Sequence, residues 1–113
     1  MSKIKQRLAE LQITLPTAGA PAAAYVMSAQ TGNTLFLSGH IAKKDGKPLA
    51  GKLGLNMSTE EGKAAARSIA IDLLATMQAH LGSLDRVKRI VKVMSLVNST
   101  QEYTEHHLSL IHI

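Results

Sequence analysis

The chain has 113 residues, of which 45% are hydrophobic and 19% are charged, with a formal net charge of +5 and no cysteine. These values predict one globular domain, and they exclude disulfides, thiolate metal sites and a cysteine nucleophile. No apolar run approaches the roughly 20 residues of a membrane span. The N-terminus has no uninterrupted apolar signal segment, so we expect a cytoplasmic protein without a membrane partner.

The positive charge falls into three separate groups, at residues 3–7, 43–52 and 86–92. Proteins that bind single-stranded nucleic acid usually interleave such charge with aromatic side chains on which bases stack. Only three aromatic residues are present, Tyr25, Phe36 and Tyr103, and no zinc-finger, RRM or helix-turn-helix spacing occurs. We therefore expect a solvated basic surface and no nucleic-acid partner.

The first half of the chain predicts a short helix followed by a β-hairpin. Apolar residues recur at helical spacing within residues 3–12, which predicts an amphipathic helix, and the Pro- and Gly-containing stretch TLPTAGAPAAA predicts a loop. Two apolar segments, AYVMSAQ and TLFLSG, then flank Thr31-Gly32-Asn33, a typical hairpin turn. Residues 40–57 are polar and glycine-rich, with Asp45-Gly46 as a turn signal, and predict a surface loop.

The clearest predicted element is a helix over residues 59–81. Ser58-Thr-Glu-Glu61 is a capping box, in which the serine and glutamate side chains satisfy free amides of the first turn. Gly82 ends the helix. Apolar residues recur every four positions behind the cap, at Ile69, Leu73, Met77 and Leu81. We expect this helix to lie on a sheet.

Residues 87–98, VKRIVKVMSLVN, are rich in β-branched side chains and predict a strand. Both faces are apolar, whereas a strand with one wet face alternates apolar and polar residues. We expect one face to meet the helix and the other to meet more protein, such as a second subunit. A further helix is expected to begin near Ser99 or Thr100. This order of elements predicts an α+β two-layer domain.

Few side chains form a recognisable catalytic pattern. His106-His107 with Glu102 lacks the third ligand that a zinc site needs, so we expect no metal. His80 falls near a helix C-terminus, where positive charge is favourable, and a structural role is expected. The stretch SGHIAKKDGKPLAGKLG does not match the phosphate-binding pattern G-x-x-x-x-G-K-[ST].

Ser38-Gly39 ends the second predicted strand. A small residue followed by glycine lets a backbone amide approach a ligand closely. The alternative is an ordinary strand end with a turn glycine, and spacing alone favours that alternative.

Three stretches together resemble the RidA-like (YjgF or L-PSP) proteins. PAAAYVMSAQTGNTLFLSGHI resembles their opening, in which a Pro-Tyr-Val-like segment precedes a hairpin that ends in a Ser-Gly-Gln-Ile-Pro-like motif. LGSLDRV resembles the family's passage into a strand, and NSTQEY resembles its turn into a helix. The similarity covers about residues 16–107 of a single domain, 1–113, and leaves 1–15 as an N-terminal helical extension.

The resemblance implies a chorismate-mutase-like α+β fold, with a mixed sheet backed by helices. It also implies a homotrimer with ligand clefts between subunits. The implied reaction needs no cofactor and hydrolyses reactive enamines or 2-imino acids to 2-keto acids and ammonia. Part of the family carries an endoribonuclease or translation-inhibitor label, and a non-enzymatic trimeric ligand-binding module is a third possibility.

The resemblance also implies where the ligand binds. Tyr25 and Gly39 match family pocket positions and Ser38 adjoins them, so these three residues are the substrate-binding candidates. His40 stands where many members have glutamine, and Ala42 replaces a proline, which leaves the substrate preference open.

The catalytic residues of the family are an arginine that holds the substrate carboxylate and a glutamate that activates water. Both are expected beyond residue 113, so no catalytic residue is assigned in this chain. Arg67, Arg86 and Arg89 lie in unrelated segments of this chain and cannot be assigned the arginine's role.

The last six residues, LSLIHI at 108–113, have no cap, no turn residue and no match to the family. They are the translation of CTG TCT CTT ATA CAC ATC, the end sequence of a transposon adapter used for sequencing libraries. We therefore expect Ser109–Ile113, with or without Leu108, to be a non-native tail that includes His112. We also expect the domain to be incomplete at its C-terminus and the chain as given to lack deaminase activity.

Overall fold

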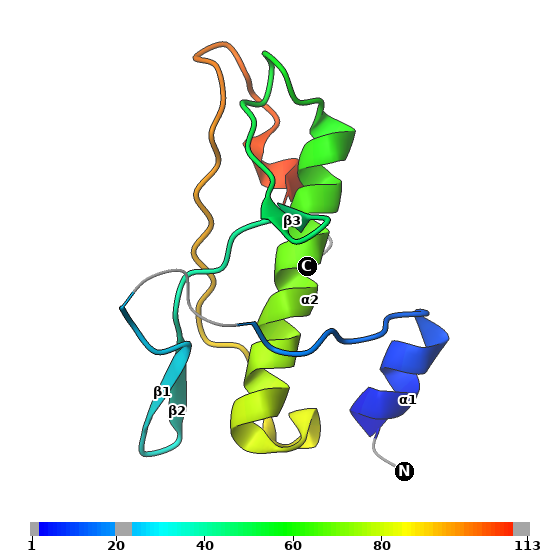
Figure 1. Ribbon diagram of the computed structural model, residues 1–113, viewed down its shortest axis with the longest axis vertical. Coiled ribbons are helices and arrows are strands. Elements are labelled where there is room, and N and C mark those ends of the chain that lie inside the picture. The colour runs from blue at the N-terminus through cyan, green and yellow to red at the C-terminus, as the bar shows by residue number, and fades with distance from the viewer. Residues whose placement is uncertain (1–2, 20–23, 110–113) are drawn as a thin grey trace. The chain divides into compact units, whose positions relative to one another are not determined.

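The computed structural model describes residues 3–19 and 24–109 (Figure 1). It is an α+β structure of helices and two separate antiparallel hairpins. The elements in chain order are α1 (Lys3–Glu10), β1 (Ser28–Thr31), β2 (Thr34–Leu37), β3 (Lys43–Lys44), β4 (Lys47–Pro48), α2 (Thr59–Leu81) and the 3₁₀ turns η1 (Leu84–Arg86) and η2 (His106–Ser109). Most of the sequence LSLIHI, including His112, lies outside the described residues.

Two compact units divide the chain. The first combines Met1–His40 with Ile71–Ile90, and the second combines Ile41–Ala70 with Val91–Ile113. α2 therefore contributes its C-terminal half to the first unit and its N-terminal half to the second. No helix among the described residues is both long and apolar enough to cross a bilayer.

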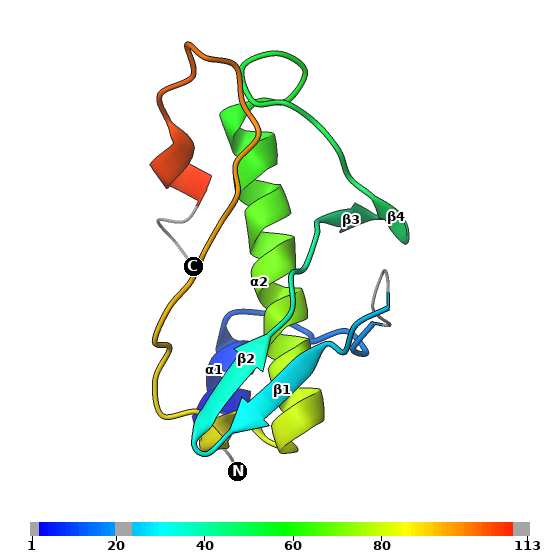
Figure 2. The same ribbon diagram turned by 90° about the vertical axis from the view of Figure 1, so that its left-hand side faces the viewer.

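The first unit contains the predicted hairpin, which the structure confirms (Figure 2). β1 and β2 pair in register from Ser28↔Leu37 to Thr31↔Thr34, with Gly32-Asn33 as the two-residue loop. Gly32 has φ +57°, and Asn33 keeps a negative φ, a combination for which glycine at the first loop position is best suited.

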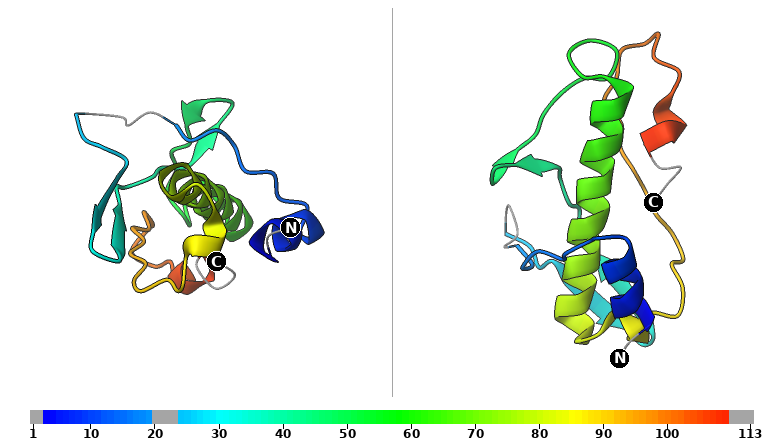
Figure 3. Two further views of the ribbon diagram at one scale, coloured as in Figure 1. Left: turned by 90° about the horizontal axis from the view of Figure 1, so that it is seen from below. Right: turned by 90° about the vertical axis from the view of Figure 1, so that its right-hand side faces the viewer.

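α1 confirms the helix predicted over residues 3–12 and lies beside the C-terminal end of α2 (Figure 3). The backbone N–H of Ile4 donates a hydrogen bond of 3.2 Å to Asp85 Oδ1 in η1. α1 has no buried residue. Its attachment to the rest of the first unit is therefore slight.

α2 begins and ends where the sequence predicts. At its start, the Ser58 N–H donates to Glu61 Oε1 and the Glu61 N–H donates to Ser58 Oγ, both at 3.1 Å, so the capping box is formed. At its end, Gly82 has φ +83° and its N–H donates to the Gln78 carbonyl at 2.8 Å. The glycine adopts the left-handed conformation that typically terminates a helix.

The capping box predicts a pH effect on stability. Hydrogen bonds from the Ser58 amide and hydroxyl, assisted by Lys44, hold the pKa of Glu61 below its ordinary value of 4.5. A carboxylate with a lower pKa in the folded state contributes stability that is present above the unfolded pKa and lost as pH falls through the folded pKa. We expect the wild type to lose its advantage over Glu61→Gln below pH 4.5.

Urea unfolding of the two proteins between about pH 6 and about pH 3 measures this difference. Glu60→Gln is the matched control, because the Glu60 side chain is 83% exposed and lies outside the capping box. The difference in unfolding free energy between wild type and Glu61→Gln should depend on pH more strongly than the difference for Glu60→Gln. Equal pH dependences would contradict a lowered pKa at Glu61.

The second unit corrects the prediction of a surface loop over residues 40–57. The segment contains a short hairpin, in which Lys43 pairs with Pro48 and Lys44 with Lys47. Asp45 has φ +55° and Gly46 has φ +78°, as a tight two-residue hairpin turn requires. The turn signal was visible in the sequence, but the flanking lysines concealed the strands because they carry no apolar alternation.

Leu53 is the centre of the second unit's small core and is 5% exposed. Its N–H donates to the Asn98 carbonyl at 2.9 Å, and its carbonyl accepts from the Thr100 N–H at 3.0 Å. Its side chain lies against Gly62 of α2, where an added Cβ would stand 2.8 Å from a Leu53 methyl group. Leu53 thus joins the start of α2 to residues 98–100.

The predicted strand over residues 87–98 is not formed in the described structure. This segment has no regular secondary structure (Figure 1) and pairs with none of the four strands, although its last residue, Asn98, accepts a backbone hydrogen bond from Leu53. Its large apolar side chains are exposed, at Ile90, Val91, Val93, Met94 and Leu96. A strand needs a neighbouring backbone to complete its hydrogen bonds, so an apolar, β-branched sequence is insufficient by itself.

Two related expectations also change. The described residues form two separate two-stranded sheets and no mixed sheet behind a helix. The helix expected to begin near Ser99 or Thr100 is replaced by a turn at residues 101–102 and the 3₁₀ turn η2.

Candidate functional site

The candidate site is the Ser38-Gly39 segment that directly follows β2. The Ser38 N–H donates to the Met27 carbonyl at 2.9 Å, which continues the β1–β2 pairing by one step. The Ser38 hydroxyl donates to the Val26 carbonyl. Val26 and Met27 directly follow Tyr25, so the structure brings Ser38 to the part of the chain that carries the Tyr25 side chain, which is 41% exposed.

Gly39 is exposed and its surroundings are open. A Cβ placed on Gly39 would meet no atom within 4 Å, and its φ lies outside the left-handed region. Neither crowding nor backbone conformation therefore requires glycine at this position. Gly39 is exposed, and its role as a ligand-binding or an ordinary turn residue stays a prediction.

His40 links this segment to α2, a connection that the sequence analysis did not identify. Its Nδ1 lies 2.7 Å from the Ser38 carbonyl oxygen and its Nε2 lies 2.7 Å from Thr76 Oγ1. Thr76 is 3% exposed, so its hydroxyl has little access to water and depends on such a partner. The sequence offered one signal, a histidine directly after the Ser-Gly pair, but nothing that paired it with Thr76.

His80 is held by the β1–β2 hairpin, in agreement with the structural role expected for it. Its Nδ1 and Nε2 each lie 3.0 Å from a partner, Ser28 Oγ and Gln30 Oε1 respectively. The Gln30 amide nitrogen donates to the Gly32 carbonyl, so its oxygen faces His80 and accepts from Nε2–H. His80, near the end of α2, therefore connects this helix to the β1–β2 hairpin through two hydrogen bonds.

The remaining histidines lie elsewhere. His106 Nε2 is 2.7 Å from Ser99 Oγ, and the His106 ring meets the Tyr103 ring edge-on with centroids 5.1 Å apart. Within residues 3–19 and 24–109, no three histidine, aspartate or glutamate side chains gather in a way that would hold a metal ion.

Arg86 is held at the C-terminal end of α2 by a backbone carbonyl. Arg86 donates from Nη1 to the Leu81 carbonyl at 2.9 Å, which caps the C-terminus of α2. Arg67 on α2 and Arg89 after η1 are exposed.

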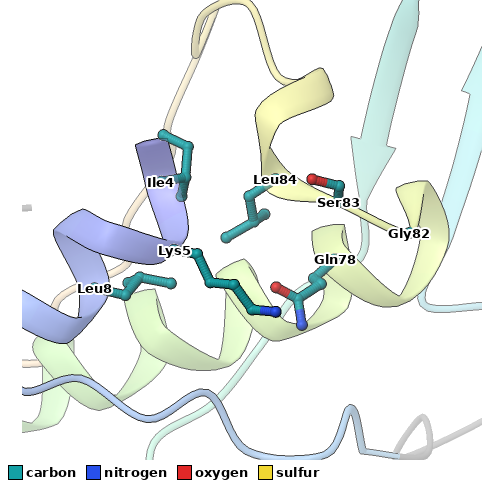
Figure 4. Close-up of a pocket in the computed structure, with 7 residues that line it drawn as sticks. All are labelled: Ile4, Lys5, Leu8, Gln78, Gly82, Ser83 and Leu84. Atoms are coloured by element: carbon teal, nitrogen blue, oxygen red, sulfur yellow. The ribbon is translucent and has the colours of Figure 1, made fainter. Parts of the chain in front are cut away.

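A separate hollow of about 290 Å³ lies between α1 and the end of α2 (Figure 4). Ile4, Leu8 and Leu84 form its apolar wall, and the Lys5 and Gln78 side chains extend along it. None of Tyr25, Ser38 and Gly39 lines it. The open surface at Gly39, and not this hollow, is the candidate site.

Comparison with solved structures identifies the fold. A proposed endoribonuclease from Shewanella oneidensis superimposes with a TM-score of 0.89 and 29% identity, over 96% of this chain and 73% of that chain. Protein Atu1372 of Agrobacterium tumefaciens, whose function is unknown, superimposes with a TM-score of 0.82 and 35% identity, over 94% of this chain and 65% of that chain.

Comparison with curated proteins finds protein TCP17 of Trypanosoma cruzi, which is 44% identical over 104 residues. The match covers 91% of this chain but 65% of TCP17, so the chain spans less than two thirds of this relative. No family model matches the chain. The two solved neighbours show that the chain has a fold consistent with that of the RidA-like (YjgF/L-PSP) proteins.

Proposed function

We propose that the protein is an imine deaminase of the RidA type, and that Tyr25, Ser38 and Gly39 form part of its substrate site. The reaction adds water across the C=N bond of a 2-imino acid, and the resulting carbinolamine expels ammonia to leave a 2-keto acid. The observation that supports the proposal most is the Ser38-Gly39 segment, whose accessible backbone lies in an open space that a ligand can enter.

The proposal divides the work between two parts of the protein. The Gly39 N–H would donate a hydrogen bond to an anionic oxygen of the substrate, and Tyr25 would cover one side of it. We propose that an arginine holds the substrate carboxylate and a glutamate activates water, and neither role is assigned to a residue of 1–113.

A homotrimer is part of the same proposal. Several large apolar side chains within residues 90–96 are exposed, and grouped exposed apolar residues are typical of a surface that other protein covers. We propose that further strands of a mixed sheet and a neighbouring subunit cover this segment in the whole protein, with ligand clefts between subunits. We also propose a cytoplasmic location.

Ligand binding gives the most direct test in this chain. We expect 2-oxobutanoate, added to ¹⁵N-labelled protein, to shift the Ser38 and Gly39 amide signals with a Kd on the order of millimolar. Gly39→Val should abolish the shifts without disturbing the fold, since its added atoms meet no neighbour. Ala29→Val, at an exposed position of β1, is the matched control. Equal binding by Gly39→Val and wild type would remove Gly39 from the site.

Activity is tested in the longer relative. TCP17 added to a threonine dehydratase reaction should lower the amount of imine trapped as semicarbazone. An endoribonuclease is the second candidate, because a solved neighbour bears that proposed name and Lys43, Lys44 and Lys47 are exposed. Cleavage of RNA together with unchanged imine trapping would favour this candidate and reject the deaminase.

A further inference from the structure

The His40 ring joins two parts of the first unit that are far apart in sequence. On one side it contacts the Ser38 carbonyl, and on the other it contacts Thr76 in the buried part of α2, each at 2.7 Å. Two bonds from opposite edges of a planar ring fix its position as well as its orientation. The Ser38 carbonyl is therefore anchored to α2.

The chemistry of the partners determines which way the protons lie. A carbonyl oxygen only accepts, so His40 Nδ1 carries a hydrogen and donates to Ser38. In the neutral ring Nε2 then accepts from the Thr76 hydroxyl.

Anchoring the Ser38 carbonyl also sets the direction of the Gly39 N–H. The two groups belong to one peptide plane, and in a trans peptide they point in opposite directions. The described residues contain no cis peptide bond. Since the carbonyl points to His40, the Gly39 N–H points away from His40, on the segment where a Cβ would meet no neighbour.

We propose that His40 is a positioning residue, which together with Thr76 holds the Ser38-Gly39 peptide so that the Gly39 N–H is a preformed donor for an anionic oxygen of the ligand. The assignment of a 2-keto or 2-imino acid as that ligand rests on the proposed function. The orientation of the peptide by His40 does not, because it follows from the contacts alone. A donor that is already oriented binds more tightly, since no ordering of the backbone opposes binding.

The test compares His40→Ala with His80→Ala in the chain of residues 1–113. Both histidines contact a partner through each ring nitrogen within the first unit, but only His40 contacts Ser38. We expect His40→Ala to raise the Kd for 2-oxobutanoate about tenfold and to accelerate hydrogen exchange of the Gly39 amide. His80→Ala should lower the melting temperature without changing either quantity.

Conservative variants separate positioning from folding. Thr76→Ser keeps the hydroxyl and should retain wild-type affinity, whereas Thr76→Val is nearly the same size, lacks the hydroxyl and should resemble His40→Ala. His40→Gln offers a donor and an acceptor and should restore part of the affinity. The ¹⁵N shifts of the neutral His40 ring should show a protonated Nδ1, and a neutral ring protonated at Nε2 alone would overturn the geometry.

The outcomes distinguish this inference from the proposed function. Absence of any 2-oxobutanoate response in the wild type rejects the proposed ligand, and faster Gly39 exchange in His40→Ala then still supports positioning. If hydrogen exchange of the Gly39 amide is unchanged in both His40→Ala and Thr76→Val, the positioning role of His40 is overturned, whatever the ligand. Equal affinity of wild type and His40→Ala for 2-oxobutanoate overturns it as well.

Discussion

Replacing Leu53 by alanine is expected to lower the free energy of unfolding by about 2–4 kcal/mol. Leu53 is 5% exposed and its side chain lies against the buried Gly62 of α2. The substitution removes the buried methyl groups and leaves a cavity that the two flanking backbone bonds, to Asn98 and Thr100, prevent from closing. Urea unfolding followed by circular dichroism measures the change.

Leu55→Ala is the control for this prediction. Leu55 follows Leu53 by two residues, is the same residue type and is 72% exposed. Its loss should change stability by no more than about 0.5 kcal/mol. If the two variants unfolded at the same urea concentration, the result would contradict the assignment of Leu53 to the core.

Placing lysine at both Val91 and Leu96 is expected to weaken self-association by about 100-fold or more. The two side chains are 79% and 89% exposed, so in an isolated chain the changes should alter stability little. In an assembly that covers this segment they would place two charges in an apolar interface, at a cost of several kcal/mol. Each 1.4 kcal/mol corresponds to a tenfold change in affinity.

Sedimentation velocity over a range of protein concentrations measures the association. Leu55→Lys is the matched control, because Leu55 is an exposed leucine outside residues 90–96 and should leave the assembly unchanged. A wild-type protein that stays monomeric at every concentration would argue against the trimer and against the need to cover this segment.

Local signals predicted α1, α2 and the first hairpin. The capping box at Ser58–Glu61 and Gly82 defined both ends of α2, because the groups that satisfy a helix terminus lie within one turn of it. The hairpin followed from Gly32-Asn33 because its two strands are neighbours in sequence and a two-residue turn is enough to pair them. Residues 87–98 failed as a strand because strand formation depends on a partner elsewhere, which the sequence of a single segment does not contain.

The candidate site also combines residues that a local pattern indicates with a contact that depends on the fold. Ser38 and Gly39 are candidates from their position at the end of a predicted strand, and the structure adds the absence of any steric need for glycine at residue 39. The contact between His40 and Thr76 spans 36 residues of sequence. No periodicity or spacing rule links residues so far apart, so this contact required the fold.

The slight attachment of α1 has a consequence for how the chain opens. α1 has no buried residue, its Ile4 N–H donates to the Asp85 carboxylate, and a hollow lies beneath it, so we expect α1 to detach while α2 stays folded. Amides of residues 5–10 should then exchange with solvent through a local fluctuation, far faster than those in the middle of α2. Such opening exposes Leu84 and the C-terminal turn of α2, and would make the peptide bonds after α1 the first target of a protease.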